Sequence, residues 1–268
     1  MAKFLKKFTE LTAYTAAQSS LILPNVSLVT EGNMVKYNPT ETRIIATFNV
    51  TSTTESTQII NGTRLTEFTS IEIDGVEQPS VVSAYTFSTT GEHTVKYTLT
   101  GQTTIYWATF TDCVDMINVI IPNNITGIGE NAFYGCGLTS ATIPNSVTYL
   151  GHQSFRSCYS LKRINSDVDD VINIPSSVTN IDGRAFAWSS GITSVVIPDS
   201  VTNMGYQIFR ECKGLTSVTI EATTPPTLGT DVFYNTNDCP IYVPSGSVDA
   251  YKAASGWSDY ASRIQAIG

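Results

Sequence analysis

The chain has 268 residues, of which 41% are hydrophobic and 14% are charged, and its formal net charge is −8. This length allows two or three modest domains, and the apolar fraction is sufficient for a packed core. An acidic chain lacks the basic surface that binding to nucleic-acid phosphates requires, so we predict no nucleic-acid partner.

Membrane insertion and conventional export are both disfavoured. No run of 18 or more apolar residues is present, which excludes a membrane-spanning helix at the level of sequence. Lys3, Lys6 and Lys7 stand at the N-terminus, but polar residues interrupt the apolar core that a secretory signal needs after its positive charges. We therefore expect no export by the usual route, unless a signal precedes Met1 in a longer gene.

Residues 1–41 are predicted to form an arm rather than a domain. Phe4, Phe8 and Leu11 recur at helical spacing, and a strongly apolar extended piece covers residues 21–29. The arm either folds onto the β-domain that follows it or becomes ordered on a partner, and we favour the second interpretation. The predicted anchoring residues are Phe4, Phe8, Leu11, Leu21, Ile22, Leu23 and Val26.

The arm resembles a known group of proteins. The sequence L-I-L-P-N-V-S-L-V over residues 21–29, followed by V-x-Y-N-P, is similar to the N-terminus of virion proteins from tailed phages of gut Bacteroidales. The resemblance implies a structural protein of the phage virion, either a head-decorating fibre or a tail adhesin. Its arm would dock on a capsid or tail protein of the same virion. A homotrimer is the expected assembly, because fibres are often trimeric.

Residues 42–103 are predicted to form a small β-sandwich. Strand-like runs occur at 43–50, 70–75 and 93–99, and Asp74–Gly75 is a tight-turn pair. The segment T-x-G-x-H-x-V-x-Y at 89–97 resembles a step near the last strand of bacterial immunoglobulin-like (Ig-like) modules. The resemblance implies an Ig-like module that acts as a spacer and as an N-terminal cap for the next domain.

Residues 104–240 contain an internal repeat, whose reiteration predicts a solenoid. Its most regular markers are Phe110, Phe133, Phe155, Phe186, Phe209 and Phe233, at intervals of 23, 22, 31, 23 and 24 residues. Three residues after the first five of them stand Cys113, Cys136, Cys158, Ser189 and Cys212. The unit L-x-x-V-x-I-P-x-S-V-T-x-I-G-x-x-A-F-x-x-C describes one coil with short strands. We interpret the cysteines as small side chains that pack inside the coils, without a metal or a catalytic role.

This pattern resembles the BspA-type (Treponema-type) leucine-rich-repeat family. The resemblance implies a mostly β fold with a leucine-rich-repeat solenoid, and a role in surface adhesion and protein binding. Residues 241–268 are similar to the C-terminal cap of that family. We expect a short helix with Ser247 as its N-cap residue, and Val248, Tyr251 and Trp257 over the open end of the solenoid.

The 31-residue interval contains an insert, Asn165 to Ile172, with Asp167, Asp169 and Asp170. We expect a solvated loop on one edge of the solenoid. A calcium site is the alternative, because carboxylate oxygens are the ligands that Ca²⁺ prefers.

The sequence offers no constellation for chemistry. It has two histidines, and no Ser/His/Asp set, metal-ligand pair or phosphate loop is visible. We predict a non-enzymatic protein without a cofactor. Aromatic and arginine side chains offer a candidate binding surface on the solenoid for a host-surface glycan or protein: Tyr134, Tyr149, Arg156, Tyr159, Trp188, Tyr206 and Arg210. The alternative, which the sequence favours, is that most of these side chains only pack the convex side of the solenoid.

Two hypotheses on function follow. In the first, the chain is located on a virion and displays its solenoid toward host-surface or mucosal ligands. In the second, it is a BspA-type adhesin of the bacterial cell surface.

Overall fold

The structure is a computed structural model, which describes residues 28–31, 34–37, 42–166 and 170–268. The chain divides into two compact units, Met1–Glu41 and Thr42–Gly268. In the first unit, β1 (Leu28–Glu31) and β2 (Met34–Tyr37) form an antiparallel pair. All seven predicted anchoring residues of the arm lie outside the described residues.

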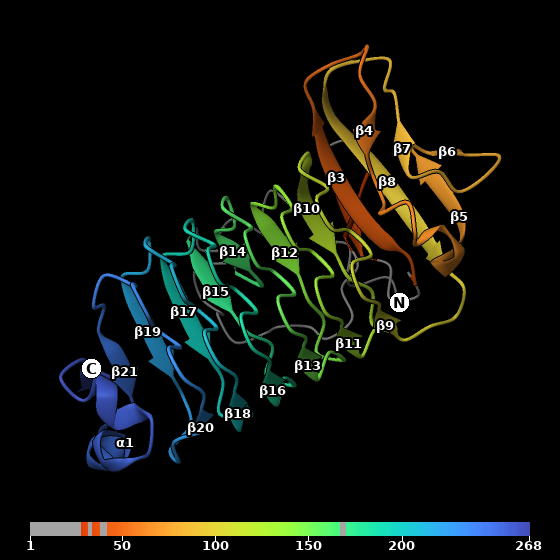
Figure 1. Ribbon diagram of the computed structural model, residues 1–268. Coiled ribbons are helices and arrows are strands. Elements are labelled where there is room, and N and C mark those ends of the chain that lie inside the picture. The colour runs from red at the N-terminus through yellow and green to blue at the C-terminus, as the bar shows by residue number, and fades with distance from the viewer. Residues whose placement is uncertain (1–27, 32–33, 38–41, 167–169) are drawn as a thin grey trace. The chain divides into compact units, whose positions relative to one another are not determined.

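The second unit is a solenoid of stacked coils that continues an antiparallel sheet (Figure 1). A 12-stranded sheet runs along one side. Its strands are, in order, β22 (Ile264–Ala266), β21 (Ile241–Val243), β19 (Ser217–Ile220), β17 (Ser194–Ile197), β15 (Val171–Asn173), β14 (Arg163–Ile164), β12 (Ser140–Thr142), β10 (Met116–Ile120), β3 (Ile44–Val50), β8 (Gly91–Leu99), β5 (Phe68–Ile73) and β6 (Val76–Glu77). From β10 to β22 the pairing is parallel.

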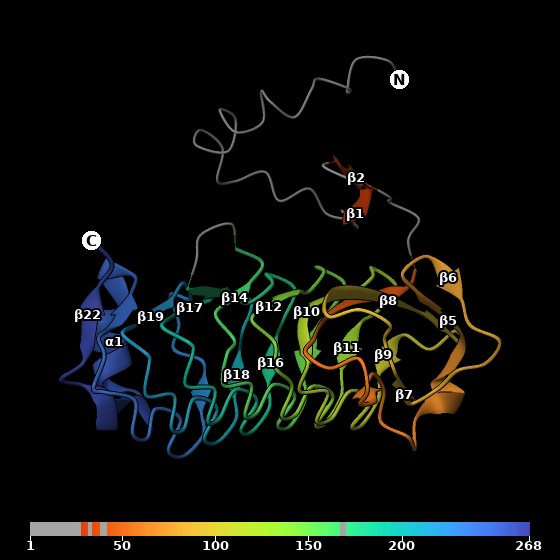
Figure 2. The ribbon, with the colours of Figure 1, turned by 90° about the horizontal axis from the view of Figure 1, so that it is seen from above.

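A 6-stranded parallel sheet forms the opposite side of the coils. Its strands are β20 (Thr227–Leu228), β18 (Asn203–Met204), β16 (Asn180–Ile181), β13 (Tyr149–Leu150), β11 (Gly127–Ile128) and β9 (Thr104–Ile105). Seen from above, the coils stack in one row toward the C-terminal cap (Figure 2). We number them coil 1 to coil 6 by their phenylalanines: Phe110, Phe133, Phe155, Phe186, Phe209 and Phe233.

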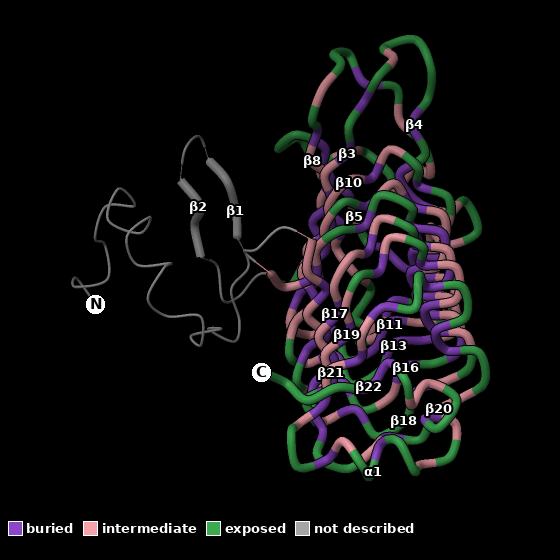
Figure 3. The backbone as a smooth tube through the Cα atoms, turned by 90° about the vertical axis from the view of Figure 1, so that its left-hand side faces the viewer, coloured by how far each residue is buried: buried purple, intermediate pink, exposed green. Residues whose placement is uncertain are grey.

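The residues that recur in each repeat are those that face the interior of the coils. Figure 3 shows that buried and exposed residues alternate along the backbone of the coils. β17 and β19 alternate half-buried and buried positions, as the period of two of a strand requires. The threonines of the V-T and I-T steps also have a clear role. Thr148 Oγ1 donates to Thr126 O, and Thr202 Oγ1 donates to Thr179 O, so these hydroxyls add hydrogen bonds between coils.

The six repeat phenylalanines form a continuous stack through the core. Consecutive ring centroids lie 5.2 to 5.8 Å apart, with interplanar angles of 7° to 11°. At one end Tyr97 contacts Phe110 edge-on, at 5.2 Å. At the other end Tyr260 contacts Phe233 edge-on, at 5.3 Å. Aromatic residues from outside the repeat thus close both ends of the stack.

The cysteines lie inside the coils, as predicted, and they also form hydrogen bonds. The thiol of Cys136 donates to Phe110 O at 2.9 Å, and the thiol of Cys158 donates to Phe133 O at 3.1 Å. Cys212 makes the same contact with Phe186 O. Burial raises the pKa of the Cys158 thiol to about 12, so these groups remain protonated donors at neutral pH.

The insert differs from the loop we expected. Val171 and Ile172 belong to β15, which lies between β14 and β17, and Ile172 is fully buried. The prediction of a loop was wrong there, because the run Val171–Asn173 alternates in the way a strand requires. In the other sheet β13 pairs directly with β16. The insert therefore widens one side of the solenoid by about 4.8 Å, the spacing of one strand.

Residues 42–103 do not confirm an Ig-like sandwich. β3, β8, β5 and β6 are antiparallel strands of the solenoid's own large sheet, because β3 pairs with β10 of coil 1. Only β4 (Thr57–Gln58) and β7 (Ala84–Tyr85) form a separate two-stranded sheet. The physical reason is that β10 offers an edge of unpaired backbone groups, and β3 covers it.

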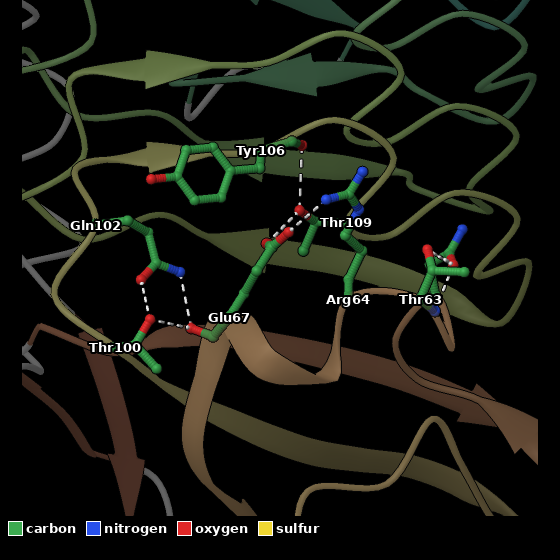
Figure 4. Close-up of polar contacts among 8 residues, drawn as sticks. Thr63, Arg64, Glu67, Thr100, Gln102, Tyr106 and Thr109 are labelled. Carbon is green, nitrogen blue, oxygen red and sulfur yellow. Dashed lines mark hydrogen bonds and ion pairs between the residues drawn. The ribbon is translucent and has the colours of Figure 1, made fainter.

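A polar cluster joins this region to coil 1 (Figure 4). The Glu67 carboxylate accepts a hydrogen bond from Thr109 Oγ1 at 2.8 Å and pairs with Arg64 at 3.4 Å. The Glu67 carbonyl accepts from Thr100 N and Gln102 Nε2. Burial raises the pKa of Glu67 above its ordinary value. These contacts attach the antiparallel strands to the first coil.

The C-terminal segment covers the core of coil 6 and contains the short α-helix that we expected, α1 (Val248–Ala253), with 3-10 turns at Ser245–Ser247 and Trp257–Tyr260. One short α-helix does not by itself confirm a helical cap. β22 adds a strand to the large sheet, and Tyr251 and Trp257 are buried as expected. Ser247 precedes α1, but its side chain does not cap it. Its hydroxyl donates to Thr223 O at 2.7 Å, a contact with the preceding coil that sequence spacing does not reveal.

Candidate binding surface

The turns that carry the phenylalanines present a line of alternating arginine and aromatic side chains. Arg156 Cζ lies 5.5 Å from the ring centroid of Tyr134 and 4.6 Å from that of Trp188. Arg210 Cζ lies 5.7 Å from Trp188 and 4.3 Å from Tyr234. We call Tyr134, Arg156, Trp188, Arg210 and Tyr234 the arginine–aromatic surface. It extends from coil 2 to coil 6.

The backbone of these turns explains why the side chains align. In each coil the residues two before and two after the phenylalanine have positive φ, for example Asn131 (53°) and Gly135 (69°) in coil 2. Three backbone hydrogen bonds then join each turn to the next, such as Phe133 N to Ser154 O at 2.8 Å. Residues at the same position in successive turns therefore lie above one another, one strand spacing apart.

Trp188 is the exception to this register. The position directly after the phenylalanine holds Tyr134, Arg156, Arg210 and Tyr234, but in coil 4 it holds the buried Ala187. Trp188 is the next residue, with a φ of 62°, and its ring lies between the two arginines. A bulky side chain in the left-handed region is uncommon, because its Cβ crowds the backbone. The same conformation occurs two residues after the phenylalanine in every coil, so it is a property of the turn and places the Trp188 side chain between the arginines.

The two arginines of this surface differ in their ion pairs. Arg210 lies 3.8 Å from Asp231, whereas Arg156 has no carboxylate partner within the described part of the chain. Arg156 Nε is buried and makes no hydrogen bond there. An incoming acceptor could not reach this buried atom, so the donors that Arg156 offers to a partner are its Nη groups.

Of the seven predicted surface residues, the structure brings four together: Tyr134, Arg156, Trp188 and Arg210. Tyr234 completes the line and was missed, although its place directly after Phe233 could have identified it. Tyr149 and Tyr206 lie elsewhere, next to Gly127 and Gly183 of the preceding coils. Tyr206 OH is 3.0 Å from His152 Nε2, and Arg184 lies over its ring. Tyr159 is 60% exposed and makes none of these contacts.

A Cβ at Gly183 would lie 2.4 Å from Tyr206 Cε1, so only glycine leaves room for this tyrosine ring. Tyr206 therefore spans coil 4 to reach His152 of coil 3. This contact stabilises the coils around the 31-residue interval and leaves the ring 40% exposed.

The described ranges contain neither a cluster of metal ligands nor a membrane-spanning helix. No group of three His, Cys, Asp or Glu side chains there could hold a metal ion. Asp167 and Asp169 lie outside those ranges, so the calcium alternative for the insert remains a prediction. Asp170 lies 3.9 Å from Lys162 Nζ. No helix in the described segments is long and apolar enough to cross a bilayer.

Comparison with known proteins supports the repeat. Residues 80–170 and 165–251 match the family described as "BspA type Leucine rich repeat region", in six copies. No curated protein matches the chain.

Solved structures of leucine-rich-repeat proteins are also similar. One is from T. pallidum (24% identity, TM-score 0.45, covering 55% of this chain and 65% of that protein). Another is from Bacteroides ovatus (23% identity, TM-score 0.31, covering 54% of this chain and 47% of that protein). A third, a cell surface protein of Faecalibacterium prausnitzii, is 23% identical with a TM-score of 0.31, covering 64% of this chain and 59% of that protein. The chain thus spans less than two thirds of each of these proteins.

Leucine-rich-repeat proteins generally bind other molecules rather than catalyse reactions. Since the family match extends over more than half of its residues, this chain belongs to the BspA-type leucine-rich-repeat family.

Proposed function

We propose that the chain is a non-enzymatic, adhesin-type binding protein that contacts its partner through the arginine–aromatic surface. The observation that carries this proposal is Trp188, whose ring lies between the guanidinium groups of Arg156 and Arg210, at 4.6 and 5.7 Å. Trp, Arg and Tyr are the residues that dominate binding energies at protein interfaces.

The chemistry favours a protein over a glycan as the partner. Guanidinium groups lie over the rings of Tyr134 and Trp188, so these rings are not free for stacking on a sugar. The edges of Arg156 remain available for carboxylate or carbonyl oxygens. An acidic protein surface, or carboxylate groups on a mucosal glycoprotein, would supply them.

We also propose where the protein is located. The sequence of the arm supports a virion, where residues 1–41 would dock on a capsid or tail protein and a homotrimer would display the solenoids. The alternative is a bacterial cell surface. Mass spectrometry of purified particles from the source culture distinguishes the two. A constant copy number per particle supports the virion, whereas recovery in envelope fractions of uninfected cells supports the bacterial surface.

Binding is tested with three proteins: wild type, Arg156→Ala and Asp199→Asn. The last changes an exposed residue away from the surface and serves as the control. Each is labelled and applied to intact host cells and to immobilised mucin. We expect Arg156→Ala to lose roughly tenfold or more in affinity, the effect of removing an interface hot spot. Equal binding by all three proteins would contradict a role for the arginine–aromatic surface.

A further inference from the structure

The backbone hydrogen bonds between successive turns end differently at the two ends of the solenoid. Between coils 5 and 6, for example, Gln207 N donates to Thr230 O, Phe209 N to Val232 O, and Glu211 N to Tyr234 O, at 2.8 to 3.0 Å. The donors are alternate residues of one turn, and the acceptors are alternate residues of the next. Coil 1 therefore exposes carbonyl acceptors, and coil 6 exposes N–H donors.

The acceptor end is closed by the antiparallel region. Thr109 O of coil 1 accepts a hydrogen bond from Asn61 N at 2.9 Å, and Thr111 O accepts one from Gln58 Nε2 at 2.7 Å. These residues occupy the place that a preceding coil would take. Two of the three acceptors of coil 1 are thus satisfied.

The donor end is open. The equivalent donors of coil 6 are the N–H groups of Asp231, Phe233 and Asn235. Phe233 N has a long hydrogen bond to Tyr260 OH, at 3.4 Å. The N–H groups of Asp231 and Asn235 have no acceptor within the parts of the chain that the structure describes. The C-terminal segment covers the core and extends the large sheet, but it does not complete this edge.

A cavity lies at this edge. Its volume is about 590 Å³, and it separates the turn of coil 6 from the residues between Asp259 and Gln265. This volume lies within the range of about 300–1,000 Å³ that is typical of ligand sites. Asp231, Tyr234 and Asn235 line one wall, and Tyr260 and Arg263 line the other.

The charges of the lining favour a cationic occupant. The Arg263 guanidinium is already engaged, since Nε donates to Cys239 O and Nη2 donates to Thr236 Oγ1. Asp231 is paired with Arg210. The carboxylate of Asp259 has no partner in the described residues, and that of Asp238, with a side chain 98% exposed, lies 3.9 Å from Arg263.

We propose that this open end of the turns, from Asp231 to Asn235, binds an extended peptide segment of a partner protein that carries lysine or arginine side chains. Backbone carbonyls four residues apart in the peptide accept from Asp231 N and Asn235 N, as Thr230 O and Tyr234 O accept from Gln207 N and Glu211 N, and thus add one further turn to the stack. Its basic side chains meet Asp238 and Asp259. The cavity shares Tyr234 with the arginine–aromatic surface, but its backbone donors are not part of that surface, so peptide binding here and binding through Arg156 can fail separately.

The first test uses hydrogen exchange of backbone amides, measured by NMR on the full chain. We expect the amides of Asp231 and Asn235 to exchange rapidly, whereas those of Gln207, Phe209 and Glu211 are protected. Equal protection of the two groups would overturn the proposal, because the edge would then be closed.

The second test adds two probe peptides with blocked ends, Lys-Thr-Val-Lys-Thr-Val-Lys and its glutamate counterpart. We expect the lysine peptide to shift and protect both amides, and the glutamate peptide to bind roughly tenfold more weakly. Ser262→Trp fills the cavity from its exposed wall and abolishes the effect, while Asp199→Asn leaves it unchanged. Absence of any change at millimolar lysine peptide overturns the proposal, as does a response to N-acetylglucosamine alone, which would make the cavity a saccharide site.

Discussion

Ser189 Oγ donates a 2.8 Å hydrogen bond to the carbonyl oxygen of Phe155, one coil earlier in the stack. The thiols of Cys136, Cys158 and Cys212 make the same contact with the phenylalanine of their own preceding coil. Serine can replace cysteine at this position because the requirement is a small buried donor. Ser189 Oγ also accepts a hydrogen bond from Cys158 N, at 3.2 Å, so one hydroxyl satisfies two backbone groups.

Ser189→Ala is therefore expected to destabilise the protein far more than Ser189→Cys. Alanine leaves Phe155 O and Cys158 N buried without partners, at a cost of about 2–4 kcal/mol in the free energy of unfolding. Cysteine retains the donor and should cost about 1 kcal/mol or less. Urea unfolding of the two variants measures the difference. Equal stability of the two variants would contradict the requirement for a hydrogen-bond donor at this position.

The phenylalanine stack predicts a second large effect. Phe155 lies between Phe133, at 5.2 Å, and Phe186, at 5.5 Å, and is fully buried. Phe155→Ala is expected to lower the free energy of unfolding by about 3–5 kcal/mol, since it removes the ring and leaves a cavity. The matched control is Tyr159→Ala, an exposed aromatic residue in the same coil, with an expected change of about 0.5 kcal/mol or less. Similar losses in both variants would contradict a stabilising role for the stack.

The stack also shows what the sequence could predict. The spacing of the phenylalanines, the cysteines and the Ile-Pro pairs was sufficient to locate the coils, because each marker occupies one buried position per turn. The cap residues Tyr251 and Trp257 followed from the need to cover an open core. At these positions the sequence pattern and burial in the folded protein both require an apolar side chain, so the pattern was enough to predict them.

Other features depend on contacts that spacing does not encode. Residues 42–103 have the alternation of strands, but alternation does not reveal which edge they pair with, and β3 pairs with β10. The aspartates of the insert suggested a loop and obscured the strand that follows them. Trp188 takes part in the arginine–aromatic surface from a different repeat position than its neighbours, because the small Ala187 leaves room for it.

The buried thiols predict a decline in stability at alkaline pH. Burial raises the pKa of Cys158 from 9.0 to about 12 in the folded state. The free energy of unfolding is unaffected by this thiol below the pKa that it has in the unfolded chain, which is near 9. It falls as the pH rises from 9 toward the folded-state pKa of about 12. Between these two pKa values, ionisation of Cys158 in the unfolded chain lowers the free energy of unfolding by about 1.4 kcal/mol per pH unit.

Cys158→Ser removes this ionisation but keeps a donor for Phe133 O. We expect wild type and Cys158→Ser to have similar free energies of unfolding at pH 8, and the variant to gain relative to wild type at pH 9.5 and 10. The other buried thiols and tyrosines titrate in both proteins, so the difference isolates Cys158. Parallel pH profiles would contradict the prediction.

The insert is held in place by Asn165, which has a φ of 50°. Its Oδ1 accepts from Ile143 N at 2.9 Å, and its Nδ2 donates to Ile143 O at 2.8 Å, so the side chain acts as a strand residue beside coil 2. Asn165→Gly removes both hydrogen bonds but tolerates the positive φ, and should lower the free energy of unfolding by about 1–3 kcal/mol. Asn165→Ala should cost about 1 kcal/mol more, because alanine is strained in the left-handed region. Urea unfolding of both variants separates the hydrogen bonds from the strain. If Asn165→Gly were neutral, β15 would be held by the burial of Ile172 rather than by the Asn165 side chain, since the strand could then form without the contact to Ile143.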